Sequence, residues 1–133
     1  MEIIIDCFKA VIKTQHPEMY EKCNAIIRCG ASAMDDIRKN KPIYCPEIEP
    51  VGTAMVVELA KTFDCKVTER AAQFRFKKAY SVLAREAFKT SVKGIWALPK
   101  IHPRVNVPRS DDIGWFMATH FYGMWNDGKE EEK

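Results

Sequence analysis

The chain has 133 residues, of which 47% are hydrophobic, 29% charged and 11% aromatic, and its formal net charge is +3. These values are typical of one globular domain that buries a core of its own, and they exclude an intrinsically disordered chain. No stretch approaches the roughly 20 apolar residues that cross a bilayer, so no membrane-spanning helix is expected.

Apolar residues recur at three- and four-residue spacing in the first part of the chain, which predicts two helices there. The first covers residues 2–14. His16 and Pro17 separate it from a second helix over 17–39, because proline fits the first helical position, where its missing N–H would have no partner. Small residues in the second helix would let another helix approach closely: Gly30, Ala31 and Ala33.

Proline separates the next predicted elements. The third helix, over 52–63, is apolar on nearly every side, which indicates burial. Residues 64–67 form a short link, and Thr68 is predicted to cap a fourth helix over 69–92. Residues 40–51, before the third helix, are predicted to be an extended loop because they contain three prolines: Pro42, Pro46 and Pro50.

The last part of the chain repeats this order of loop and helix. Residues 95–109 hold three more prolines and are predicted to be a second extended loop. Ser110-Asp111-Asp112 favours a helix start, because acidic residues stabilise the positive end of the helix dipole, and a fifth helix is expected over 111–125. The charged residues 126–133 are predicted to be a tail. The predicted fold is therefore all-α: one domain over 1–125, a bundle of about five helices with two proline-rich extended loops.

The cysteines are scattered along the chain without a CxxC pair. An odd number of such thiols, mostly inside apolar segments, is typical of free, buried cysteines in a reducing compartment. Glu2 and Asp6 are not typical of a signal peptide or a presequence. We therefore expect an intracellular protein. The cysteines are Cys7, Cys23, Cys29, Cys45 and Cys65.

Positive charge gathers in the second half of the chain. Residues 66–109 contain eleven Lys and Arg against two acidic residues, so their local net charge is +9 and the remainder carries −6. On the fourth helix the cations fall opposite the apolar stripe, interleaved with two phenylalanines. Such a face could bind phosphates by charge and bases by stacking. It could also be a solvated face whose phenylalanines pack under another helix, or it could meet an acidic protein surface. Its residues are Arg70, Phe74, Arg75, Lys77, Lys78, Arg85, Phe88 and Lys89.

A helix-turn-helix at about 54–80 is a related hypothesis for nucleic-acid binding. The second helix of that motif enters the major groove, so the residues that would face the nucleic acid are Lys66, Thr68, Glu69, Arg70 and Gln73. Asp64 stands in the turn where glycine is usual, and Arg70 and Gln73 occupy positions that are normally apolar. Ala71 and Phe74 could supply the apolar residues instead if the turn is one residue longer. These departures weaken the resemblance to the motif.

The sequence contains few residue patterns that are typical of a catalytic site. The histidines are His16 and His102, each beside a proline, and His120 in the apolar last segment. No H-E-x-x-H, Walker-type glycine loop, G-x-G-x-x-G or G-x-S-x-G occurs, and the Cys and His residues lack the paired spacing of metal ligands. We therefore predict neither an enzyme nor a metal or cofactor site.

The fifth predicted helix is unusually rich in aromatic side chains. It is either the central core helix or an interface whose anchors are aromatic, because Trp and Tyr are favoured at binding hot spots. The function hypothesis is a non-catalytic helical protein that docks onto a protein partner, a larger assembly or a second copy, as an accessory subunit or regulator. Nucleic-acid binding by the basic helix is the alternative. The predicted partner-binding residues are Trp115, Phe116, Tyr122 and Trp125.

Overall fold

The computed structural model describes residues 2–39, 45–95 and 108–131, and it describes side chains for residues 4–39, 45–86 and 108–126. The described residues contain five helices and no strand, which confirms the predicted all-α fold class. The helices are α1 (Glu2–Gln15), α2 (Pro17–Arg38), α3 (Ile48–Thr62), α4 (Glu69–Ile95) and α5 (Ser110–Glu131).

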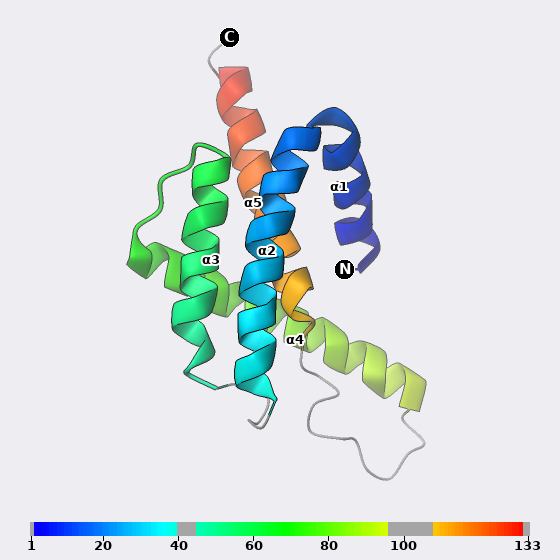
Figure 1. The fold of residues 1–133 in the computed structure, drawn as a ribbon. Helices are drawn as coiled ribbons and strands as arrows, with labels where there is room; N and C mark the ends of the chain where they lie inside the picture. Colours follow the sequence, from blue (N-terminus) through cyan, green and yellow to red (C-terminus); the bar gives the residue numbers. More distant parts are fainter. Residues whose placement is uncertain (1, 40–44, 96–107, 132–133) are drawn as a thin grey trace.

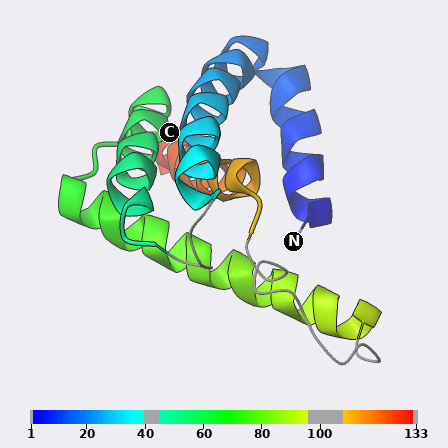
Figure 2. The same cartoon turned by 60° about the horizontal axis from the view of Figure 1, so that its bottom comes forward.

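Helix α5 is the element around which the others pack, since it contacts each of the other four helices. Helices α2 and α3 lie side by side, with α5 behind them and α1 along the other side of α2 (Figure 1). Helix α4 crosses beneath this group and contacts α3 and α5 (Figure 2). Among the described helices, α3 and α5 are the ones that contact α4, so within the described residues one side of α4 has no neighbouring helix along part of its length.

Three of the described glycines lie at close helix crossings, one of which brings Gly114 of α5 against Ile27 of α2. Met55 of α3 lies against Gly30 of α2, where the sequence predicted a close approach. The ring of Phe76, on α4, lies directly over Gly52 of α3 and occupies the space that a Cβ atom would need. The buried side chains of α4, including Ala72 and Phe76, thereby reach the core beneath α3.

Three helix boundaries differ from the sequence predictions by three residues or more. Helix α3 begins at Ile48, so residues 48–51 are helical and not part of a loop. Pro50 is accommodated because it lies in the first turn, where backbone N–H groups have no partner within the helix. Helix α4 continues through Gly94 to Ile95, and α5 continues past Trp125 to Glu131. Glycine and charged residues are therefore compatible with helix at both of these ends.

The turn between α3 and α4 is fixed by backbone geometry. Asp64 has φ of +57°, in the left-handed region. Its N–H donates to the carbonyl of Lys61 at 3.0 Å, and the N–H of Cys65 donates to the carbonyl of Ala60 at 2.8 Å. These two bonds form a Schellman motif, which ends α3. Thr68 then caps α4 as predicted, since its hydroxyl accepts the N–H of Ala71 at 3.1 Å.

Replacing Asp64 with glycine is expected to raise the free energy of unfolding by about 0.5–1 kcal/mol, because glycine adopts positive φ without the steric cost of a side chain. Urea unfolding measures the change. Asp64→Val is the control and is expected to lower stability by about 1 kcal/mol or more, since a β-branched residue is strained at this φ. A glycine variant less stable than the wild type would contradict this description of the turn.

Candidate interaction groove between α4 and α5

An open groove of about 660 Å³ runs between α4 and α5. Its α4 side spans the first half of that helix, and its α5 side is formed by one turn around Met117. We call it the α4–α5 groove. Its lining residues are Thr68, Arg70, Ala71, Phe74, Arg75, Lys78, Ala79, Val82, Phe116, Met117 and His120.

Helical spacing explains how α4 contributes both to the core and to the groove. Phe76 and Leu83, seven residues apart, are buried. The adjacent face of α4 is turned toward the groove. Its residues recur every three or four positions, as Ala71, Phe74 and Lys78 do. Helix α4 thus packs one face into the core and lines the groove with the adjacent face.

The apolar floor of the groove includes a large exposed side chain. Phe74 is 67% exposed, whereas Phe116 is half-buried and Met117 is buried. Burying an aromatic side chain of this kind stabilises a complex by about 1.5–3 kcal/mol. The floor therefore offers a partner a substantial apolar contact.

The charged groups that line the groove are all basic. Arg70 and Lys78 are exposed on α4, and none of the lining residues is Asp or Glu. The guanidinium of Arg75 lies 5.6 Å from the centre of the buried Phe121 ring, a cation–π contact that holds it at the groove wall. His120 is exposed on the α5 side. The groove thus combines an apolar floor with a cationic rim.

Five predicted site residues come together at this groove: Arg70, Phe74, Arg75, Lys78 and Phe116. The others from the basic face do not line it. Lys77 turns to the opposite side, where its ammonium lies 3.4 Å from Glu49 of α3. Arg85 is exposed on α4 beyond the groove. The side chains of Phe88 and Lys89 lie outside the described residues.

The remaining predicted aromatic anchors make contacts within the chain. Trp115 is 2% exposed, and its ring stacks on Tyr20 of α2 at 5.4 Å between centres. Tyr122 and Trp125 are half-buried and contact His16 at the corner between α1 and α2, at 6.0 Å and 5.4 Å between ring centres. Most of the aromatic excess of α5 is therefore explained by packing against α1, α2 and α3.

The α3–α4 pair differs from a helix-turn-helix in two respects. Residues 63–68 separate the helices, whereas the turn of that motif has about three to four residues. Gln73, expected on the recognition face, donates to the carboxylate of Glu49 at 3.0 Å and so faces α3. Asp64, however, adopts the backbone conformation that a glycine would supply in such a turn.

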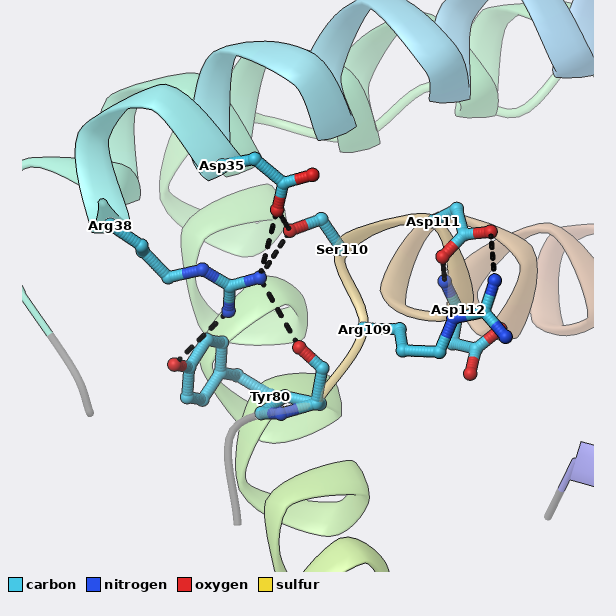
Figure 3. A network of polar contacts seen from close by, with 8 residues as sticks. Asp35, Arg38, Tyr80, Arg109, Ser110, Asp111 and Asp112 are labelled. Atoms are coloured by element: carbon cyan, nitrogen blue, oxygen red, sulfur yellow. Dashed lines mark hydrogen bonds and ion pairs between the residues drawn. The ribbon is translucent and has the colours of Figure 1, made fainter. Parts of the chain in front are cut away.

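The Arg38 network is a polar cluster that the sequence analysis missed (Figure 3). Arg38, at the end of α2, is only 9% exposed. Its guanidinium donates to the Tyr80 hydroxyl at 3.3 Å, to the Pro108 carbonyl at 3.2 Å and to the Ser110 hydroxyl. The network also includes Asp35, which accepts from Arg38 at 3.3 Å and from Ser110 at 2.5 Å. Arg38 thus joins the ends of α2 and α5 to the middle of α4.

The spacing of buried residues could have revealed Arg38. It lies four residues after Met34 and eleven after Ile27, on the buried stripe of α2. Basic residues usually lie on the solvent face of a helix, whereas this one is buried and both terminal nitrogens of its guanidinium donate hydrogen bonds. Burial raises the pKa of the Tyr80 hydroxyl above its ordinary value near 10.0, and the hydrogen bond from Arg38 offsets part of that rise.

The cysteines are free thiols, as predicted, but not all are buried. Cys23 and Cys45 are buried, Cys65 is half-buried, and Cys7 and Cys29 are exposed, which corrects the expectation for those two. Both exposed cysteines fall on the outer faces of α1 and α2 because neighbouring positions on those helices fill the core. Burial raises the pKa of the Cys23 thiol from 9.0 to about 12.

The raised pKa of Cys23 predicts that stability falls at alkaline pH. Below pH 9 the thiol is neutral in both states; between pH 9 and 12 the unfolded chain loses the proton while the native chain keeps it. The free energy of unfolding should therefore decrease by up to about 1.4 kcal/mol per pH unit in this range. Urea unfolding at several pH values measures the slope. Cys23→Ala should reduce it, and equal slopes in the two proteins would contradict the assignment.

In the described part of the chain, no three His, Cys, Asp or Glu residues gather in a way that could hold a metal ion. None of its helices is long and apolar enough to span a bilayer. His102 lies outside the described residues, and His16 and His120 lie on different sides of α5.

Comparisons with family models, curated proteins and solved structures found no match to this chain. Function is therefore inferred from the geometry of the α4–α5 groove.

Proposed function

We propose that this chain is a non-catalytic interaction protein, an accessory subunit or regulator, whose α4–α5 groove receives a segment of a protein partner. The observation that carries this proposal is the exposure of Phe74, at 67%, beside an apolar floor that contains Phe116. Large exposed apolar surfaces with a polar rim are typical of protein-binding sites. Aromatic and arginine side chains are the commonest hot-spot residues at such sites.

The lining of the groove favours a protein segment over nucleic acid. Its floor is formed by apolar side chains, which suit the side chains of a protein better than a sugar-phosphate backbone. A site for single-stranded nucleic acid combines a continuous basic track with several stacking aromatics. Here Lys77 is paired with Glu49, and Phe74 is the exposed aromatic among the described residues of α4.

The polar groups of the groove favour binding over catalysis. The exposed polar residues of its lining are Arg70, Lys78, His120 and Thr68. General acid–base or nucleophilic catalysis needs two groups that converge on one reacting atom. The hydroxyl that lines the groove, that of Thr68, accepts the N–H of Ala71 as the cap of α4.

Selection from a displayed library of random peptides, with the purified chain as bait, tests the proposal. Selected peptides are synthesised and their binding is measured by fluorescence anisotropy against wild type and Phe74→Ala. We expect peptides whose affinity falls at least tenfold with Phe74→Ala, about 1.4 kcal/mol. Met124→Ala is the matched control, because Met124 is also exposed, at 43%, but does not line the groove.

Two outcomes would overturn the proposal. One is that no selected peptide distinguishes Phe74→Ala from Met124→Ala. The other is that a single-stranded oligonucleotide binds at low salt more tightly than any selected peptide and loses affinity with Phe74→Ala, which would support the nucleic-acid alternative.

A further inference from the structure

We infer that the partner segment is an acidic amphipathic helix, with acidic residues about two turns apart on either side of an apolar pair. This inference rests on the proposed function, because it specifies the occupant of the same groove. Two features of the groove support it: the order of charged and apolar residues along α4, and the positive charge of the groove lining.

The order along α4 is cation, aromatic, cation. Arg70, Phe74 and Lys78 follow one another at intervals of four residues, and all three are exposed. At 1.5 Å per residue, Arg70 and Lys78 are about 12 Å apart along the axis of α4, or a little more than two turns. A partner helix that lies along α4 would therefore meet the two cations with residues separated by about seven or eight positions. Its apolar residues at the intervening three- and four-residue positions would lie over Phe74.

The positive charge of the groove indicates that the partner segment should be negatively charged. The groove is lined by Arg70, Arg75 and Lys78 without an acidic residue among them. A docked neutral or basic segment would remove water from these cations without supplying acidic groups in its place, and this desolvation costs free energy. Carboxylates at the rim would pair with them and would speed association.

Helical backbone suits the floor better than an extended strand. The apolar lining residues offer no hydrogen-bonding side chain to an approaching backbone. They include Ala71, Phe74, Val82, Phe116 and Met117. An extended segment would leave its own N–H and C=O groups without partners there, because the walls are helices and offer no sheet edge. A helix satisfies these groups internally and presents only side chains.

The test uses three designed helical peptides of about 18 residues, each labelled for fluorescence anisotropy. The first has leucine at positions i+3 and i+4 and glutamate at i and i+7, repeated along its length. The second replaces the glutamates with lysine, and the third replaces the leucines with serine. We expect the first to bind at least tenfold more tightly than either of the others and to weaken as salt is raised, because salt screens rim charges.

Charge-reversal variants of the protein make the test specific. The double variant Arg70→Glu/Lys78→Glu should bind the glutamate peptide at least tenfold more weakly than the wild type does. It should bind the lysine peptide more tightly. Lys22→Glu is the matched control, since Lys22 is exposed on α2 away from the groove and should change neither affinity. Circular dichroism checks that each variant is folded. Equal binding of the glutamate and lysine peptides, or equal effects of the rim and control reversals, would overturn the inference.

The two proposals fail in different ways. If library selection yields peptides that depend on Phe74 but carry no acidic residues, the proposed function stands and the acidic-helix inference is wrong. If neither selected nor designed peptides depend on Phe74, both are wrong. A dimer of this chain that forms in light scattering and is disrupted by Phe74→Ala would overturn the inference in favour of a second copy as the occupant.

Discussion

Replacing Gly52 with alanine is expected to lower the free energy of unfolding by about 2 kcal/mol or more. The new methyl group would overlap the ring of Phe76, which is fully buried and cannot move aside without displacing the core. Overpacking of this kind costs about 1–3 kcal/mol and occasionally more, although alanine recovers up to about 1 kcal/mol through its higher helix propensity. Urea unfolding followed by circular dichroism measures the difference.

Gly123→Ala is the matched control for this prediction. Gly123 also lies within a helix, but a Cβ atom there would meet no atom within 4 Å. This change should raise stability by up to about 1 kcal/mol, because only the helix propensity differs. A second variant tests the contact itself: Phe76→Leu should reduce the additional cost of Gly52→Ala, since the smaller side chain leaves room for the methyl group. Similar effects of Gly52→Ala and Gly123→Ala would contradict the close α3–α4 crossing.

Replacing Arg38 with methionine is expected to lower the free energy of unfolding by about 2–4 kcal/mol. The change removes the donor that serves the Tyr80 hydroxyl, the Pro108 carbonyl and the Ser110 hydroxyl, and these buried groups would lose hydrogen bonds. Loss of a buried charged partner costs about this amount because the remaining polar groups stay desolvated. Thermal or urea unfolding measures the loss.

The neighbouring residue provides the control. Lys39 pairs with Asp36 at 3.7 Å, and both side chains are more than 70% exposed. Lys39→Met should therefore change stability by less than about 1 kcal/mol, as is usual for surface ion pairs. Tyr80→Phe removes one acceptor of the Arg38 network and should cost about 1 kcal/mol. Equal effects of Arg38→Met and Lys39→Met would contradict a structural role for the network.

Local sequence signals predicted the helices because each has a strong physical cause. Pro17 begins α2, Thr68 caps α4, and the acidic residues after Ser110 accompany the start of α5. The start of α3 at Ile48 differs from the prediction because three prolines within residues 40–51 favour an extended loop over that whole segment. Pro50 breaks no helix, since in the first turn its missing N–H removes no intrahelical bond.

Features that depend on tertiary contacts could not be predicted in this way. Arg38 is buried only because Tyr80 and Ser110, from distant parts of the chain, supply acceptors for its guanidinium. Likewise, nothing in α5 alone indicates that Trp115 is buried against Tyr20 whereas Phe116 lies at a groove. The predicted basic face is divided because of a tertiary contact too. Lys77 forms an ion pair with Glu49 on α3 and does not line the groove.

Amide chemical-shift mapping by NMR tests the central claim most directly. The glutamate peptide is titrated into the labelled protein, and the shifted residues are assigned. The largest shifts are expected on α4 between Arg70 and Val82 and on α5 between Phe116 and His120. Shifts concentrated elsewhere, such as around His16 and Trp125 or along α1, or no shifts at saturating peptide, would contradict the assignment of the α4–α5 groove as the binding site.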